Sequence, residues 1–416
     1  MELFNQLLAE IERIPAIDVH SRVPMESPAA VDAAGILLSA DLRTELRASG
    51  APAALLEMED TRRQVLEIAP SFEQLRNTTT YWRLQQILHD LYEVDAHPHE
   101  SGADEVWDRV KRTAADSQWP ATVLGRAKVA RILCACDWSR RVPPASGAFA
   151  PILRLDSLVN EPFSSKSLDR LGELTNQSIY EAGDLRKAVG QLIANAAEAG
   201  AVGVCAAFDP PVDFEEGSRD AADRILSLVL LGQKIDRADR KALRSYVMDL
   251  VLEACAEHSV PFQLMLGMQR PPREGPSLSA FEPGAAAMYS GLFARHPHTR
   301  FDVAVGSETL AHQFTVAARA CPNVCVSGCW WSLMFPTHMR KTLRERIEML
   351  PATRVNALWS AAGCVEWVYA TSKLVRRELA FVLARMVSEG YLSEATAVST
   401  AQSYLHDNPA LMYKSS

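Results

Sequence analysis

The chain has 416 residues, of which 48% are hydrophobic and 23% are charged, so it can bury a large core in one big α/β domain or in two domains. Its 43 Lys and Arg against 51 Asp and Glu give a net charge of −8, which argues against nucleic acid as a partner. The absence of long apolar runs, of a signal-peptide pattern and of a disulfide-like cysteine arrangement predicts a cytoplasmic protein with no membrane partner.

The predicted elements begin with an amphipathic helix that ends before Pro15 and a short apolar strand over 16–20. Residues 27–125 then show apolar side chains at helical spacing, which predicts a long helical region. From Val129 onward, short apolar runs alternate with helical stretches. These runs predict seven more strands, at 129–138, 151–157, 200–209, 261–270, 300–307, 323–331 and 353–361.

Eight strands that alternate with helices are the number that closes a TIM barrel. We therefore predict an α/β fold, a distorted (β/α)8 TIM barrel with a helical insertion after strand 1. The expected division is an N-terminal helix with strand 1 over 1–26, a helical insertion or lid over 27–126, and the rest of the barrel with C-terminal helices over 127–416. A doubly wound open sheet is the alternative, but no Gly-rich phosphate loop follows the first strand.

Reactive groups of a TIM barrel lie at the carboxyl ends of its strands, so the sequence itself nominates a site. The polar and aromatic side chains at or near these ends include Asp18, His20, Arg22, Asp137, Arg154, Asp156, Arg270, Trp330, Trp331, Trp359 and Ser360, with Gln263 and Met265 further down strand 5. Several arginines suit a small anionic ligand, because a guanidinium can bind a carboxylate or phosphate through two hydrogen bonds. The alternative is that these arginines pair with neighbouring aspartates and only hold loops.

Four stretches of the sequence carry a resemblance to a known family. They read AIDVHSRV, LRNTTTYWRLQQIL with Arg76 and Tyr81, VCVSGCWWSLMFP, and RVNALWSAAGCVEWVY followed by KLVRREL. Together they resemble the uronate isomerases of the amidohydrolase superfamily. The resemblance implies a distorted TIM barrel and the interconversion of aldose and ketose sugar acids such as glucuronate and fructuronate.

The resemblance also implies a metal site, and this chain departs from it. The family's metal is held by a His-x-His pair on strand 1, a His on strand 5 and an Asp that ends strand 8. The matching positions hold His20, Arg22, Met265 and Ala361, so one ligand of four remains. We therefore expect neither a metal nor another cofactor. A tyrosine expected after strand 1 is also missing from residues 37–46.

The leading functional hypothesis is a metal-independent enzyme that moves a proton on a small carboxylate or sugar-acid-like substrate, through an enolate. His20 with Asp18 would act as acid or base, with Asp137 as a further catalytic candidate, and Arg22 would stabilise the enolate oxygen. The residues expected to bind substrate are Arg154, Asp156, Gln263, Met265, Arg270, Trp330, Trp331, Trp359, Arg76 and Tyr81.

Several alternatives remain open at this stage. Elimination or decarboxylation could proceed through the same enolate as isomerisation. The chain could be a non-catalytic barrel that binds a sugar acid or a protein partner, or a conventional metal-dependent isomerase if strands 5 and 8 are misaligned. Two other His-x-His sequences, at 97–99 and 296–298, are interpreted as loop histidines. The resemblance also implies a homo-oligomer, either a dimer or a trimer.

Overall fold

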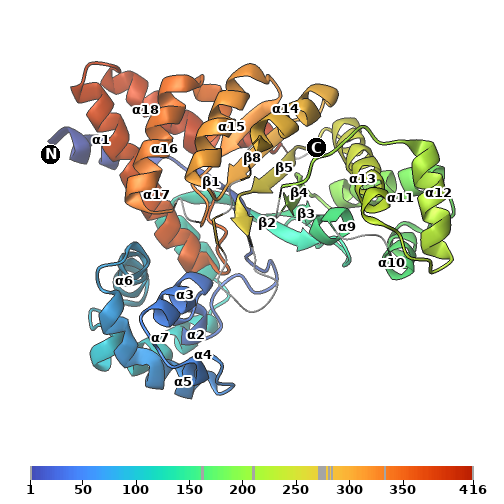
Figure 1. Cartoon of the computed structure of the whole chain (residues 1–416). Coiled ribbons are helices and arrows are strands. Elements are labelled where there is room, and N and C mark those ends of the chain that lie inside the picture. Colours follow the sequence, from blue (N-terminus) through green and yellow to red (C-terminus); the bar gives the residue numbers. More distant parts are fainter. Residues whose placement is uncertain are drawn as a thin grey trace. The chain divides into compact units, whose positions relative to one another are not determined.

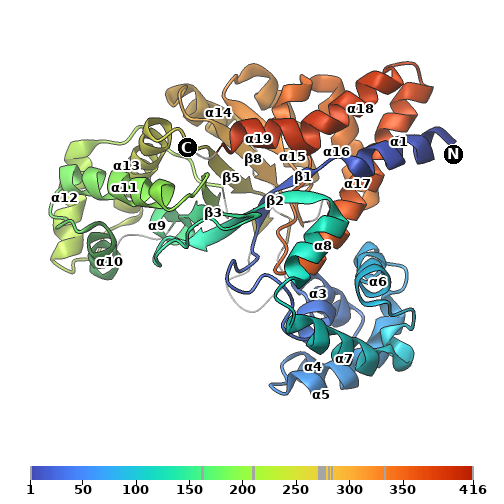
Figure 2. The ribbon, with the colours of Figure 1, turned by 180° about the vertical axis from the view of Figure 1, so that it is seen from behind.

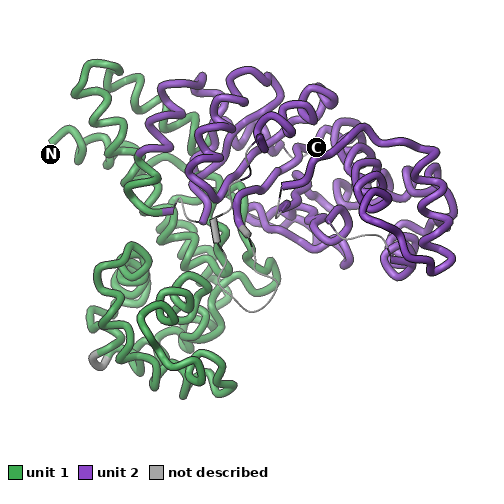
Figure 3. Tube along the Cα trace, in the orientation of Figure 1, with its two compact units in different colours: residues 1–132, 335–340, 358–406 green, residues 133–334, 341–357, 407–416 purple. Residues whose placement is uncertain are grey.

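The computed structural model describes residues 2–160, 164–208, 211–269, 278–279, 282, 284–331 and 334–414. The chain divides into two compact units (Figure 3). Unit 1 comprises residues 1–132, 335–340 and 358–406, and unit 2 comprises residues 133–334, 341–357 and 407–416.

Eight parallel strands form a nearly closed barrel, in the order β1-β2-β3-β4-β5-β8-β9-β10 (Figure 1). They are β1 (Ala16–Ser21), β2 (Val129–Asp137), β3 (Phe149–Arg154), β4 (Val204–Phe208), β5 (Phe262–Leu266), β8 (Phe301–Val305), β9 (Val324–Ser327) and β10 (Val355–Asn356). Each overlaps one of the eight predicted runs: β1 extends one residue beyond its run, β3 begins two residues before its run, and the other six lie within theirs. Every residue of β5 and β8 is buried, as expected for parallel strands covered on both faces.

The barrel continues past β10 through the segment 358–362, which runs beside β1 within unit 1. The amide of Val19 donates to the carbonyl of Leu358 at 3.1 Å, and the amide of Ala361 donates to the carbonyl of His20 at 2.9 Å. These bonds bring the end of strand 8 against the end of strand 1.

Helices separate β1 from β2, as predicted for the insertion. They are α2 (Ala33–Leu37), α3 (Ala40–Ala48), α4 (Ala53–Leu56), α5 (Thr61–Ile68), η1 (Ala69–Leu75), α6 (Thr79–Tyr92), η2 (Pro98–Gly102), α7 (Ala103–Ala114) and α8 (Trp119–Ala127). The hydroxyl of Thr78 caps α6 by accepting from the amide of Tyr81 at 3.1 Å. The predicted segment boundaries at 26 and 126 stay a prediction.

Three further helices of unit 1 pack together: α1 (Glu2–Arg13), α17 (Val365–Ser388) and α18 (Glu394–Gln402). Figure 2 shows α1 beside the other two. The long α17 follows the segment 358–362 directly, so its first turn lies close to the end of strand 8. Among the described helices, none combines the length and the apolar character needed to cross a membrane.

The helices of unit 2 follow its strands. They are α9 (Asp156–Asn160), α10 (Ser165–Thr175), α11 (Ala182–Glu198), α12 (Arg219–Leu230), α13 (Arg237–Glu257), α14 (Ala285–Arg295), α15 (Glu308–Ala320) and α19 (Asn408–Met412). Helix α16 (Pro336–Met349) begins in unit 1 and continues into unit 2, where η4 (Ala352–Arg354) follows it. The element η5 (Ser403–Asp407) follows α18 in unit 1 and ends at the first residue of the last segment of unit 2. A short antiparallel pair, β6 (Met268–Gln269) with β7 (Leu278–Ser279), follows β5 and was not predicted.

Candidate active site

The carboxylate of Asp18 is fully buried on β1 and is held by strand 8. One of its oxygens accepts from the amide of Ser360 at 2.9 Å and from the amide of His20 at 3.4 Å, and the other accepts from the Ser360 hydroxyl. Burial raises the pKa of Asp18 to about 7, although the hydrogen bonds from Ser360 lower it. Asp18 therefore changes protonation close to neutral pH.

The imidazole of His20, two residues further along β1, packs face to face on the indole of Trp359. The ring centroids lie 4.5 Å apart and the planes differ by 6°. His20 is 2% exposed and Trp359 is 1% exposed, so the pair is closed off from bulk water. Because alternate residues of a strand share one face, His20 and Asp18 lie on the same side of β1. The structure thus brings together Asp18, His20 and Trp359, three of the residues predicted from the sequence.

Arg22 and Ala361 lie at the same end of β1. The side chain of Arg22 is exposed, and its amide donates to the carbonyl of Ala362 at 2.8 Å. Ala361 has a φ of +50°, in the left-handed region that residues with a Cβ rarely adopt. The backbone at the end of strand 8 therefore carries local strain, at the position that matches the family's metal-binding Asp.

The predicted residues of the insertion, Arg76 and Tyr81, have different environments. Arg76 follows η1 and is exposed, whereas Tyr81 on α6 is 3% exposed. The Tyr81 hydroxyl is 2.8 Å from Nδ1 of His97, whose ring stacks near that of His99. The substrate-binding roles of Arg76 and Tyr81 stay predictions.

In unit 2, Arg154 at the end of β3 pairs with Asp156. The guanidinium Nε lies 2.7 Å from the carboxylate, whose other oxygen accepts from the amide of Ala207 at 2.9 Å. Such a pairing is the alternative to ligand binding, in which the arginine pairs with a neighbouring aspartate and only holds a loop. Asp137, at the end of β2, is exposed and accepts from the amide of Ser139 at 2.8 Å.

Gln263 on β5 is fully buried and belongs to a polar network in unit 2. Its amide nitrogen donates to the hydroxyl of Tyr413, which follows α19, at 2.8 Å, and that hydroxyl donates to Asp302 on β8. Burial raises the pKa of Asp302 to about 6. Met265, two residues along the strand, is 6% exposed. Substrate binding by Gln263 and Met265 stays a prediction.

Trp330 and Trp331 follow β9. Trp330 is 4% exposed, while Trp331 is half-buried with a φ of +52° and lies against Gly306, where an added Cβ would be 3.3 Å from the indole. Burial raises the pKa of the neighbouring Cys329 thiol to about 11, so this cysteine is a poor nucleophile near neutrality. Arg270, also predicted to bind substrate, lies outside the described residues.

Two residues of unit 1 that matter for this region were assigned no role from the sequence. One is Ser360, which holds Asp18. The other is Glu366 in the first turn of α17, fully buried, which accepts from the amide of Ala30 at 3.1 Å, the Tyr92 hydroxyl at 3.0 Å and the Trp119 indole at 2.9 Å. The apolar neighbours of Glu366 in the sequence CVEWVY were the available indication that it is buried.

The residues at the end of β1 do not fit a divalent metal ion. Of the unit 1 positions that match the family's ligands, His20 supplies a nitrogen donor, Arg22 is a cation and Ala361 has no donor atom. In the part of the chain that the structure describes, no three His, Cys, Asp or Glu side chains are grouped so as to hold a metal.

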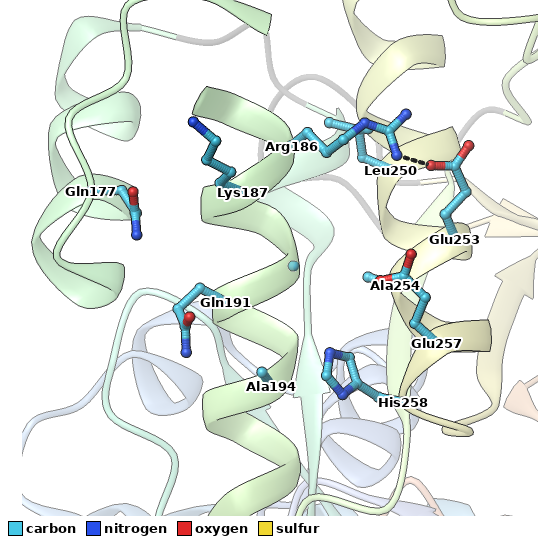
Figure 4. A pocket seen from close by; sticks show the side chains of 11 residues that line it. Gln177, Arg186, Lys187, Gln191, Ala194, Leu250, Glu253, Ala254, Glu257 and His258 are labelled. Atoms are coloured by element: carbon cyan, nitrogen blue, oxygen red, sulfur yellow. Dashed lines mark hydrogen bonds and ion pairs between the residues drawn. The ribbon is translucent and has the colours of Figure 1, made fainter. Parts of the chain in front are cut away.

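A groove of about 470 Å³ lies elsewhere in unit 2, between α11 and α13 (Figure 4). Arg186 reaches across it to Glu253, and Lys187, Glu257 and His258 also line it. The groove belongs to the helices outside the barrel, and none of the residues predicted for the site lines it.

Comparison with solved structures identifies the fold. The uronate isomerase of Thermotoga maritima matches with a TM-score of 0.89 and 17% identity, over 99% of this chain and 97% of that one. The glucuronate isomerase of Caulobacter crescentus matches with a TM-score of 0.87 and 16% identity, over 99% and 94% of the two chains. A uronate isomerase of Bacillus halodurans matches with a TM-score of 0.78 and 18% identity, over 100% and 97%.

No family model and no curated sequence matches the chain. The chain therefore has the fold of the uronate isomerases at low sequence identity. This agrees with the resemblance found in the sequence motifs. A fold of this kind hosts many chemistries, so the reaction has to be argued from the site.

Proposed function

We propose that this protein is a sugar-acid isomerase-type enzyme that moves a proton with His20 and needs no divalent ion at β1. The observation that carries the proposal is the buried imidazole of His20, which stacks on Trp359, in a residue whose backbone amide donates to the anchored Asp18. It occurs at the carboxyl end of a barrel strand, where TIM-barrel enzymes place their reactive groups. The fold shared with uronate and glucuronate isomerases supports a hydroxy-acid substrate.

His20 is suited to proton transfer because an imidazole ordinarily titrates near pH 6.5 and can both accept and return a proton. In an aldose–ketose interconversion, His20 would take the proton from the carbon next to the carbonyl. The electron pair of that C–H bond moves into an enediolate. The proton then returns to the former carbonyl carbon, while another proton passes between the two oxygens.

The enediolate oxygen carries negative charge that must be stabilised. Arg22 is the cation nearest in sequence to His20, and its side chain is exposed just beyond the end of β1. A fixed cation can do part of the work that a metal ion does in other enzymes. The donor set at β1 supports this assignment, because Arg22 supplies a cation at a position where the resembled family has a metal ligand.

The proposal is tested by incubating the chelator-treated protein with D-glucuronate or D-fructuronate in D2O and following deuterium incorporation by NMR. We expect incorporation with the wild type, none with His20→Asn, and a loss of at least about 100-fold with Arg22→Met while the fold is retained. The matched control is His258→Asn, which changes a histidine in the groove of unit 2 and should leave the rate unchanged.

Two results would overturn the proposal. Deuterium incorporation that survives His20→Asn would remove His20 from the reaction. Binding of these acids without any incorporation would indicate the alternative function, a barrel that binds sugar acids without catalysis.

A further inference from the structure

Trp359 carries a buried hydrogen-bond donor without an acceptor. Its indole Nε1–H exposes no surface to solvent and has no partner among the described residues. Buried N–H groups in native proteins are nearly always paired, because an unpaired one keeps the full penalty of leaving water. The lone donor therefore needs an explanation.

Other buried indoles of the chain show what the usual arrangement looks like. Trp119 donates to Glu366 at 2.9 Å, and Trp138 donates to the Ser157 hydroxyl at 2.8 Å. Trp367 also lacks an acceptor, but the guanidinium of Arg83 lies 5.3 Å from its ring centroid. The cation over the ring favours an aromatic side chain at that position, although it does not pair the indole N–H.

The neighbour of Trp359 is the proposed proton carrier. Because the indole stacks on His20 with ring centroids 4.5 Å apart, an acceptor that is hydrogen-bonded to the indole nitrogen lies next to the stacked pair. The two rings are rigid and buried, so their relative position is fixed before a ligand arrives. An oxygen that accepts from Trp359 would thus be placed beside the stacked pair of Trp359 and His20.

Resting on the proposed function, we infer that Trp359 Nε1–H donates to an oxygen of the bound sugar acid and so selects which carbon faces His20. The acceptor is a hydroxyl or carboxylate oxygen, which is the chemistry that an indole N–H recognises. Because the donor exposes almost no surface to solvent, the atoms that cover it must move aside when a ligand reaches it. Trp359 is then a specificity-determining residue in addition to stacking on His20.

The test uses protein labelled with 15N at tryptophan, so that each indole N–H gives its own NMR signal during a titration with D-glucuronate. The signal missing from Trp359→Phe assigns Trp359. We expect that signal to shift saturably, and we expect Trp359→Phe to weaken binding about fivefold to tenfold, the effect of one hydrogen bond. Phenylalanine keeps the stack on His20 and removes the donor.

The matched control is Trp107→Phe, which changes an indole of α7 in the insertion that lies beneath the amino group of Lys111. Its affinity for D-glucuronate should equal that of the wild type. If Trp359→Phe also binds with wild-type affinity, or if the Trp359 signal does not move at saturation, the inference is wrong even though deuterium exchange at His20 persists. If no indole signal responds and no exchange occurs, both the inference and the proposed function are wrong.

Discussion

Two tryptophans of unit 1 lie buried beside ionisable side chains, and their indole N–H groups are in opposite situations. Trp119 in the insertion donates to Glu366, which two further donors also reach. Trp359 at the end of strand 8 stacks on His20 and has no acceptor among the described residues. The indole N–H of Trp119 is therefore paired within the chain, whereas that of Trp359 lacks an acceptor among the described residues.

The difference separates a structural polar cluster from a functional one. Glu366 joins the backbone before α2, the α6 helix and the α8 helix to α17, so its hydrogen bonds hold the insertion to the helix that follows strand 8. The His20 region instead combines an unpaired donor, a strained Ala361 and a carboxylic acid that titrates near neutrality. Such local conflicts concentrate at functional sites, because a ligand or a reaction compensates them.

The largest effect is expected from Glu366→Leu, which removes the acceptor shared by Ala30, Tyr92 and Trp119. We expect the free energy of unfolding to fall by about 3–5 kcal/mol, because several buried donors lose their partner together. Urea denaturation measures the change. Glu348→Ala, at an exposed ion pair with Arg344, is the control and should change stability by less than about 0.5 kcal/mol. A loss of similar size in both variants would contradict the buried structural role of Glu366.

The next effect concerns pH and the His20 region. Folded Asp18 keeps its proton up to about pH 7, whereas the unfolded chain releases it near pH 3.8. The folded state thus binds more protons between these values, so the contribution of Asp18 to stability is full below about pH 4 and is lost as the pH rises to about 7. Relative to Asp18→Asn, the wild type should lose roughly 3–4 kcal/mol across this window. A constant difference between the two unfolding curves would contradict the assignment.

The two indoles can be compared directly by removing each donor. Trp119→Phe should reduce the free energy of unfolding by about 2 kcal/mol, because Glu366 loses a donor in a buried site. Trp359→Phe should reduce it by less than about 1 kcal/mol, since its indole N–H has no acceptor among the described residues. Thermal or urea unfolding of the ligand-free proteins gives both values. Equal losses would mean that Trp359 has a partner within the chain.

The smallest effect is expected from Ala361→Gly. Glycine adopts a positive φ without the steric cost that alanine has there, so the variant should be more stable by up to about 1 kcal/mol. Differential scanning calorimetry can resolve this gain as a raised Tm. A lowered Tm would show that the Ala361 methyl group contributes packing that outweighs the backbone strain.

Much of the fold could be predicted from the sequence. Parallel strands buried on both faces leave continuous apolar runs such as FQLML and FDVAV, and these gave all eight strands. All the predicted runs except that of β1 were longer than their strands, because apolar residues continue into the adjoining loops. The β6–β7 pair was not predicted, since two-residue strands leave no periodic pattern.

The site was only partly predictable, because hydrogen-bond partners depend on contacts between distant parts of the chain. Asp18, His20 and Trp359 followed from their positions near strand ends, but the bond from Ser360 to Asp18 joins residues 342 positions apart. The hydrogen bonds of Glu366 could not be predicted, because their donors belong to Ala30, Tyr92 and Trp119, which are all distant in sequence. The hydrogen bond from Gln263 to Tyr413 likewise joins residues 150 positions apart, so it could not be predicted from the sequence. The homo-oligomeric state stays a prediction.

The most direct test of metal-free proton transfer at His20 measures metal content and activity on one sample. The purified protein is analysed by elemental mass spectrometry without added chelator, and its deuterium exchange with D-glucuronate is then compared before and after chelation. We predict a metal-to-protein ratio well below one and an exchange rate that chelation does not change. A stoichiometric transition metal whose removal abolishes exchange would contradict the account, and the metal-dependent aldose–ketose reaction would take its place.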